Sequence, residues 1–452
     1  MVRGEDEVAK LFEEVRRAVL EAADPRQAVS RAWRPVVTPS HLLCVGKAAL
    51  AMGRGAMDGL NADGSPPKRT LVLCPHAMTG APEVLELKGD GGDGFELFGC
   101  DHPLPTARNV EAAKRVAAWV AQIPATETLV SCVSGGGSAY LTLPVEGVPL
   151  EELVALTKAL QASGADIREL NAVRKHVEQL KGGRLGQGCA CSARVYVLSD
   201  VIGDRLDVIA SGPFAPDQST YREALETLTR YGLRDVSASI TRHLEAGARG
   251  DVPETPKHAR EVGAGRIEHE VVAGNDAAVD AACAALESAG VKVVQTRRRV
   301  EGAAAEVGIS LAHDMSRDGA GEGDRAWVVG GEWVVEARGA GGKGGPSQEL
   351  ALAWAAHSAG FDGCHAMAFS TDGVDGPTDA AGAEVSSRTQ MELAQAGCHA
   401  EEALRDHDSH AALGRVGGLV KTGPTGTNVN HIVVGVKLSG HSGLLGGGRA
   451  QE

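Results

Sequence analysis

Apolar residues recur along the chain with the period of helices in some segments and as short continuous runs in others. In residues 7–20, Val8, Leu11, Phe12, Val15 and Val19 fall on one helical face, so this segment is predicted to be an amphipathic helix. Residues 41–46, HLLCVG, then form a short apolar run that predicts a buried strand. Similar runs follow between alanine-rich helical stretches, at 70–74, 128–133, 194–200 and 291–295. This alternation predicts a parallel sheet wrapped by helices.

The pattern changes beyond residue 245, where a stretch rich in Gly, Pro and charge has no apolar period. We expect a domain boundary between about 245 and 325. Residues 326–337, AWVVGGEWVVEA, are interpreted as two short strands about a Gly-Gly turn. HAMAFSTDG and HIVVGV predict further strands, so a second, smaller α/β unit is expected. The predicted division is 1–300 and 301–452.

Composition narrows the class of protein. With 452 residues and 43% hydrophobic content, the chain can bury more than one core. A net charge of −14 disfavours nucleic acid or an anionic membrane as partner, and no apolar run is long enough to span a bilayer. The nine cysteines are an odd number and lie mostly in apolar runs, which is typical of a reduced, cytoplasmic protein. A small anionic substrate is compatible with this charge if positive residues gather locally.

The segment TLVSCVSGGGSA, residues 128–139, is the main candidate for an anion site. A strand runs into Ser134, Gly135, Gly136, Gly137 and Ser138, and the glycines leave backbone N–H groups open to a phosphate or carboxylate. A tight turn that binds nothing is the alternative. The loop is not a P-loop, because no lysine follows the last glycine. It is not a dinucleotide fingerprint either, because Tyr140 stands where that motif needs a third glycine.

Two other segments offer the positive charge that this loop lacks. Lys47 follows a strand and Gly46, so its ammonium is expected at the strand ends where α/β sheets bind ligands. Residues 166–183 predict a helix, ended by Gly182 and Gly183, with an apolar stripe of Ile167, Leu170, Val173, Val177 and Leu180. Its other face carries Asn171, Arg174, Lys175, Glu178 and Lys181. A solvated charged face is the alternative interpretation of that set.

Carboxylates and hydroxyls cluster on the remaining loops. Candidates for Mg²⁺ binding are Asp200 and Asp204 in LSDVIGD, with Asp276 in AGND and Asp372, Asp375 and Asp379 in STDGVDGPTD. Asx turns are the alternative for each aspartate. A second glycine and threonine loop, KTGPTGTNVN at 421–430, precedes the last strand and also suits an anion.

Taken in order, several motifs of the chain resemble the glycerate kinases that carry a C-terminal MOFRL domain. The resemblance covers roughly residues 5–436. The motifs are VGKAA at 45–49, DHPLPT at 101–106, SGGGSA at 134–139, NAVRKHVEQLKGGRL at 171–185, SDVIGD and IASGP within 199–213, STDGVDGPTDAAGA at 370–383 and TGPTGTN at 422–428. The resemblance implies an ATP- and Mg²⁺-dependent kinase that acts on D-glycerate, in most members at the 2-hydroxyl. It also implies a Rossmann-like N-terminal domain, a smaller C-terminal α/β domain and an active site in the cleft between them.

The resemblance also implies roles for individual residues. Lys47 matches the family's proposed active-site lysine and would supply the cation for the SGGGSA loop. Asp200 or Asp204 would bind the metal or accept the substrate proton, and Arg174 and Lys181 would bind the substrate carboxylate or the transferred phosphate. Asn171 would also bind the substrate or a phosphate. The second group of loops would contribute Asn275, Asp372, Asp375, Thr425, Thr427 and Asn428. The expected partners are glycerate and ATP, and the protein is expected to be a monomer or a homodimer.

The chain departs from the family pattern at two places. Many members have GGRNQE where this chain has GGPSQE at 344–349, so Pro346 replaces an arginine. The family has an Asn-Asp pair after TGTN. This chain has Asn430 followed by His431 there, so the carboxylate is missing. Two other functions therefore stay open: a hydroxypyruvate reductase, whose dinucleotide fingerprint is spoiled by Tyr140, and a catalytically weakened sugar-acid binding protein.

Overall fold

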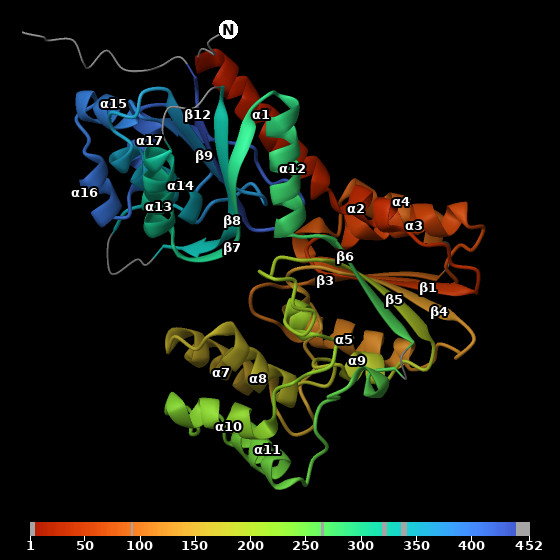
Figure 1. Cartoon of the computed structure of the whole chain (residues 1–452). Coiled ribbons are helices and arrows are strands. Elements are labelled where there is room, and N and C mark those ends of the chain that lie inside the picture. Colours follow the sequence, from red (N-terminus) through yellow and green to blue (C-terminus); the bar gives the residue numbers. More distant parts are fainter. Residues whose placement is uncertain (1–4, 92–93, 264–265, 319–322, 336–340, 440–452) are drawn as a thin grey trace, which may run out of the picture. The chain divides into compact units, whose positions relative to one another are not determined.

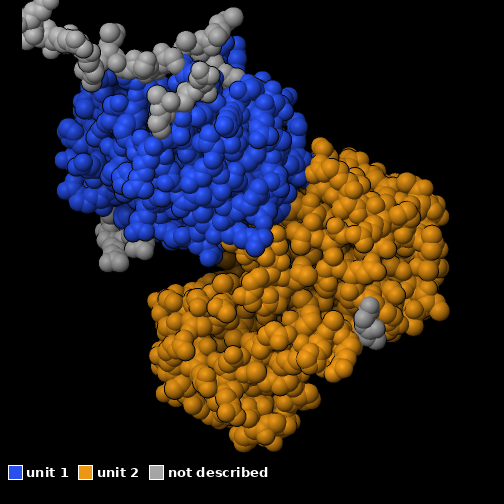
Figure 2. All heavy atoms as spheres, in the orientation of Figure 1, with its two compact units in different colours: residues 1–24, 274–452 blue, residues 25–273 orange. Residues whose placement is uncertain are grey.

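The structure is a computed structural model that describes residues 5–91, 94–263, 266–318, 323–335 and 341–439 (Figure 1). Residue contacts divide the chain into two compact units (Figure 2). Unit 1 comprises residues 1–24 and 274–452, and unit 2 comprises residues 25–273. The predicted division at 300/301 placed 1–24 and 274–300 with the N-terminal domain. In the structure these segments belong to unit 1, because helix α1 (Glu5–Ala22) packs on helix α12 (Asn275–Ser288).

Unit 2 is built on a six-stranded parallel sheet in its described residues. The strand order is β3-β2-β1-β4-β5-β6, and every printed pair runs parallel. The strands are β1 (Ser40–Val45), β2 (Thr70–Pro75), β3 (Phe95–Cys100), β4 (Thr128–Val133), β5 (Ser192–Leu198) and β6 (Ile267–Ala273). This is the strand order of a doubly wound fold. Strands β2 and β3 are added on one side of β1, and β4, β5 and β6 on the other side, so the switch point lies between β1 and β4. The Rossmann-like sheet predicted from the sequence is confirmed.

Helices cover both faces of this sheet (Figure 1). All residues of β1 are buried, because Leu43 and Val45 face the core shared with α5 while Cys44 faces Gly53 of α3. Such two-sided burial explains why the parallel strands are continuous apolar runs in the sequence. The helices of unit 2 are α2 (Pro25–Ala32), α3 (Ala49–Ala62), α4 (Pro82–Gly91), α5 (Ala107–Val120), α6 (Gly137–Tyr140), α7 (Leu150–Ala162), α8 (Ile167–Val177), α9 (Arg184–Gln187), α10 (Tyr221–Arg230) and α11 (Ala238–Arg249).

Helices α7, α8, α10 and α11 share a second apolar core in unit 2. Helix α8 contributes Leu170, Val173 and Val177 to it, as the predicted stripe requires. Two parts of the prediction for 166–183 are wrong. Ile167 is 55% exposed, and the helix ends at Val177 because Glu178 adopts an extended conformation. Residues beyond Val177 therefore lie outside the helix, and the predicted helical face does not extend to Lys181.

Unit 1 contains a mixed six-stranded sheet in its described residues, with the order β11-β10-β9-β12-β8-β7. Only the printed pair β7 and β8 is parallel. The strands are β7 (Lys292–Ala303), β8 (Arg325–Val334), β9 (Cys364–Ser370), β10 (Gly382–Ser386), β11 (Leu419–Val420) and β12 (His431–Lys437). The helices after α12 are α13 (Ala304–Arg317), α14 (Pro346–His357), α15 (Thr389–Gln395), α16 (Ala400–Arg405) and α17 (Ser409–Arg415). The second, smaller α/β unit is confirmed.

The hairpin predicted at 326–337 is wrong for its described residues, because β8 runs unbroken through Gly330 and Gly331. These glycines permit close packing instead of a turn. A Cβ on Gly330 would lie 2.4 Å from Asn275 Oδ1, and one on Gly331 would lie 1.9 Å from the carbonyl oxygen of Val300. Residues 336 and 337 of the predicted hairpin lie outside the described residues.

Candidate active site

Four of the strand ends in unit 2 bring polar residues to one edge of the parallel sheet. Lys47 follows β1, His102 follows β3, the glycine loop 134–138 follows β4, and Asp200 follows β5. Two hydrogen bonds tie the first turn to the loop: the Lys47 N–H donates to the Gly135 carbonyl at 2.8 Å, and the Ala48 N–H donates to Ser134 Oγ at 3.1 Å. The carboxyl edge of such a sheet at its switch point is where α/β folds bind ligands.

The glycines of the loop make room for charged neighbours. A Cβ on Gly135 would lie 2.0 Å from Asp200 Oδ2. One on Gly136, which has φ +84°, would lie 3.2 Å from Lys47 Cγ and 3.5 Å from His102 Cδ2. The absence of side chains therefore lets an ammonium, a carboxylate and an imidazole approach the same backbone.

The loop also keeps backbone donors available. The N–H groups of Gly135, Gly136 and Ser138 make no hydrogen bond to any residue that the structure describes. Lys47 is exposed, and its ammonium forms no ion pair or hydrogen bond within the described chain. Open N–H groups beside an exposed ammonium suit a phosphate or a carboxylate.

Helix α8 is joined to the same loop by Arg174 and Asn171. Arg174 Nη2 donates to the Ser138 carbonyl at 2.9 Å. Ser211 Oγ donates to Asn171 Oδ1 at 2.9 Å and lies 2.8 Å from Ser138 Oγ. The Asn171 Nδ2 group is buried without a partner in the described chain. Arg174 and Asn171 thus lie beside the glycine loop.

Lys181 does not reach this surface. Its side chain is fully buried and donates to Glu178, which is also fully buried and accepts from Arg174 Nε at 3.4 Å. Burial, and then the positive charge of Arg174, lower the pKa of Lys181 to about 7. We therefore interpret Lys181 as part of the internal support of Arg174 and not as a ligand-binding cation, because its ammonium is closed off from solvent.

The two predicted aspartates of the β5 loop differ in position. Asp200 lies against Gly135, and burial raises its pKa while the charge of Lys47 acts in the opposite direction. Asp204 has φ +53° and makes no hydrogen bond or ion pair with the glycine loop among the described residues. Asp200 is therefore the better placed of the two to act on a ligand at the loop.

His102 and Ser211 belong to the site, and no role was predicted for either. His102 follows β3, and its side chain is exposed. The pKa of His102 is lowered to about 4, first by partial burial of the ring and then by the positive charges of Lys47 and Arg174. Both residues lie in segments noted in the sequence, DHPLPT and IASGP. The signal that could have found His102 is the one that found Lys47, namely a polar residue directly after a predicted strand.

The predicted site residues of unit 1 form a separate cluster that is hydrogen-bonded internally. Asp372 Oδ1 accepts from Ser370 Oγ and from the Val374 N–H, and its carbonyl accepts from the Thr425 N–H. The remaining members bond to main-chain groups: Asn275 to the carbonyls of Val429 and His431, Thr425 to that of Thr371, Thr427 to that of Ala23, and Asn428 to the N–H of Asn430.

Asp375 is fully buried and caps the start of α14. Its carboxylate accepts from the N–H groups of Ser347 and Gln348, both at 2.9 Å, and from Gln348 Nε2 at 2.9 Å. Burial nevertheless raises its pKa to about 6. Pro346 occupies the first position of α14, where a proline costs no hydrogen bond. Both residues thus support the backbone of this helix.

The described residues contain no group of three or more His, Cys, Asp or Glu side chains placed to hold a metal ion. Mg²⁺ is commonly held by one or two carboxylates together with water and substrate phosphates. Of the predicted metal candidates, Asp200 is the one that borders the open N–H groups of the loop.

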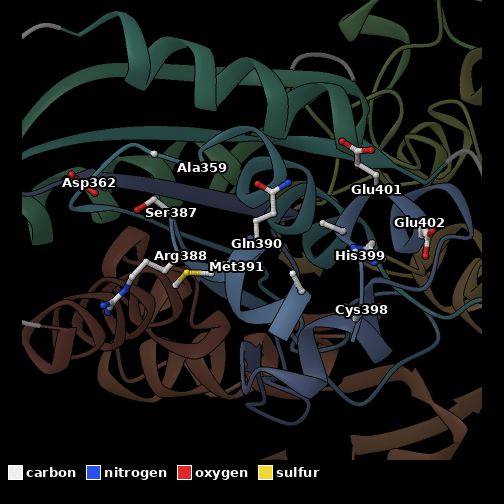
Figure 3. Close-up of a pocket in the computed structure, with 13 residues that line it drawn as sticks. Ala359, Asp362, Ser387, Arg388, Gln390, Met391, Cys398, His399, Glu401 and Glu402 are labelled. Carbon is white, nitrogen blue, oxygen red and sulfur yellow. The ribbon is translucent and has the colours of Figure 1, made fainter. Parts of the chain in front are cut away.

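A pocket of about 790 Å³ lies elsewhere, in unit 1 (Figure 3). It lies among residues of α15 and α16 and their connections, including Arg388, Met391, His399 and Glu402. None of the predicted site residues lines it. We therefore place the chemistry at the glycine loop and not in this pocket.

Unit 2 thus presents the features of an α/β enzyme domain that binds a small anion at the switch point of its sheet. Two family profiles match the chain: a domain of unknown function, DUF4147, at residues 11–245 and the MOFRL family at residues 325–431. The D-glycerate 2-kinase of Thermotoga maritima is 36% identical over 95% of this chain and 99% of its own length. The glycerate 2-kinase of Pyrococcus horikoshii is 34% identical, covering 93% and 95% of the two chains.

A solved structure agrees with these sequence matches. The crystal structure of a glycerate kinase from Thermotoga maritima superposes with a TM-score of 0.83 at 35% identity, covering 96% of this chain and all of that one. A putative hydroxypyruvate reductase of Agrobacterium vitis is 36% identical over 75% of this chain and 76% of its own length. The chain belongs to the family of glycerate kinases that carry a MOFRL domain. No helix in the described ranges is long and apolar enough to cross a membrane.

Proposed function

We propose that this protein transfers the γ-phosphoryl group of ATP to D-glycerate, at the 2-hydroxyl. The observation that carries the proposal is the meeting of Lys47, Asp200 and the open N–H groups of the glycine loop at one edge of the unit 2 sheet. Phosphoryl transfer depends mainly on positioning and on neutralising negative charge, and this edge supplies donors and a cation for both. The relatives named above support the choice of substrate.

Each residue has a stated part in this proposal. The N–H groups of Gly135, Gly136 and Ser138 hold phosphate oxygens, and the ammonium of Lys47 neutralises charge that develops on the transferred group. Arg174, which is anchored by Glu178, binds the carboxylate of glycerate. Asp200 would hold Mg²⁺, which would supply positive charge that reduces the repulsion between the phosphate groups and the substrate. The unit 1 loops serve the fold in this proposal, because the side chains of Asp372, Thr425 and Thr427 are hydrogen-bonded to main-chain groups of unit 1.

The test is a direct assay of the purified protein. With D-glycerate, ATP and Mg²⁺, we expect ADP release that depends on glycerate, and a product whose phosphorus couples to the C2 proton in an NMR spectrum. A parallel reaction contains hydroxypyruvate and NADH, because one relative is named as a putative reductase. NADH oxidation without ADP release would overturn the kinase proposal, and so would glycerate binding without turnover.

A further inference from the structure

His102 lies at the glycine loop in a position that can contact a ligand. Its Cδ2 atom lies 3.5 Å from the point where a Cβ of Gly136 would stand, and Lys47 Cγ lies 3.2 Å from that same point. Cδ2 is bonded to Nε2, so this ring nitrogen lies one bond from the atom that approaches the loop. Tyr140 supports the ring edge-on, with ring centroids 6.3 Å apart and an interplanar angle of 83°.

The imidazole of His102 is not engaged in holding the fold together. Neither ring nitrogen makes a hydrogen bond with any residue in the described ranges. Other histidines of unit 2 differ: His41 pairs with Glu127, His176 with Glu254, and His243 with the carbonyl of His176. A free, exposed imidazole beside an anion loop is available for chemistry.

The charges around His102 keep it neutral and tie its basicity to substrate binding. Lys47 and Arg174 add to partial burial in lowering its pKa to about 4, so a nitrogen lone pair is present at neutral pH. When phosphate and carboxylate groups bind to these cations, the positive charge near His102 is compensated. The imidazole then becomes a stronger base at the moment when the hydroxyl and the phosphoryl group are both in place.

We infer that His102 is the general base that accepts the proton of the attacking glycerate hydroxyl, an inference that rests on the proposed kinase function. As the O–H bond breaks, the proton moves to an imidazole nitrogen and the oxygen forms a bond to the γ-phosphorus. The bond from that phosphorus to the bridging oxygen breaks, and its electron pair leaves with ADP. The imidazolium returns its proton to water after the products depart. Asp200, which borders Gly135, keeps the metal-holding role.

The experiment compares the wild type with His102→Ala and His102→Gln in the glycerate assay. We expect kcat to fall about 10²-fold in both, with KM for glycerate and ATP changed only a few-fold, because the base acts in the transition state. Added imidazole should restore part of kcat in His102→Ala and leave the wild type unchanged. His102→Gln tests position alone, because an amide can accept a hydrogen bond but does not take up the proton.

The matched control is His76→Ala, which removes another exposed histidine, at the end of β2, and should keep wild-type kcat. An unchanged kcat in His102→Ala, a loss that imidazole does not repair, or near-normal turnover by His102→Gln would each overturn the inference. Thermal melting of each variant shows that the protein is folded. If the wild type itself releases no ADP with glycerate, the proposed function fails instead.

Discussion

The two units use similar loop sequences for different purposes. In unit 2, the loop after β4 leaves three N–H groups without partners in the described chain, and Lys47 and His102 stand beside it without internal bonds. In unit 1, the aspartates and threonines around 372–375 and 425–428 are bonded to their own backbone. The comparison teaches that glycine, threonine and aspartate in a loop do not by themselves indicate a ligand site. What distinguishes the unit 2 loop is that the side chains of Lys47 and His102 stand beside its open N–H groups without hydrogen bonds in the described chain.

The largest effect is expected at Lys47. Lys47→Ala should lower kcat by about 10³-fold, because the site loses the cation that neutralises the transferred phosphoryl group. The free energy of unfolding should change by less than about 0.5 kcal/mol, because the side chain is exposed and unpaired. Lys114→Ala, on the exposed side of α5, is the control and should behave as wild type. Near-normal turnover by Lys47→Ala would remove unit 2 from the chemistry.

A smaller effect is expected from one methyl group on the loop. Gly135→Ala places a Cβ 2.0 Å from Asp200 Oδ2, so the carboxylate must move away. Because a displacement near 1 Å at a reacting site costs about 10²-fold, kcat should fall by about that factor. Gly80→Ala adds the same methyl where nothing lies within 4 Å and should have no effect. Equal activity of the two variants would mean that the position of Asp200 is unimportant.

The next effect concerns stability and pH in unit 1. His431 stacks on Trp333 with ring centroids 5.2 Å apart, and burial lowers its pKa to about 4. An unfolded histidine titrates near 6.5, so between about pH 6.5 and 4 the unfolded chain binds more protons and stability falls as the pH falls. His431→Asn removes this loss. We expect calorimetry to show the variant gaining about 3 kcal/mol on wild type over that window, with kcat unchanged. A constant difference across the window would refute the assignment.

The smallest effect is expected at Pro346. Pro346→Arg should change the free energy of unfolding by less than about 1 kcal/mol, because the first position of α14 tolerates most residues. It should leave kcat within about twofold of wild type, since we assign this helix start to the fold. A large rise in kcat would instead mean that this position faces the reacting phosphate, and that unit 1 also supplies catalytic charge.

Elements whose burial follows a simple period were predictable from the sequence. The stripe of α1 is buried as predicted, at Val8, Leu11, Phe12, Val15 and Val19, because one side of an amphipathic helix must face a core. The apolar runs of unit 2 became buried parallel strands, because helices cover both faces of that sheet. The run at 291–295 became the start of β7, whose residues are not buried. The Gly330–Gly331 turn failed because glycine also serves close packing, and packing partners distant in sequence are invisible to a local pattern.

The site was predictable to the extent that strand ends gather at one edge of a sheet. Lys47 and the glycine loop were predicted in this way, whereas Arg174 and Asn171, on α8, were named from the family resemblance and lie beside the same loop. Lys181 was misjudged because a buried ion pair with Glu178 and a solvated one have the same spacing in the sequence. The placement of α1 in unit 1 depends on its contacts with α12, which lie far along the chain and leave no local signal.

The most direct test of the comparison pairs one aspartate from each unit. Asp200→Asn and Asp375→Asn are assayed side by side for glycerate-dependent ADP release, at equal concentrations of folded protein. The account predicts that Asp200→Asn loses about 10²-fold in kcat, while Asp375→Asn keeps kcat within about threefold. It also predicts that Asp375→Asn lowers the free energy of unfolding by about 2 kcal/mol, because three hydrogen bonds to a buried carboxylate are weakened. The reverse pattern, with turnover lost in Asp375→Asn and kept in Asp200→Asn, would contradict it.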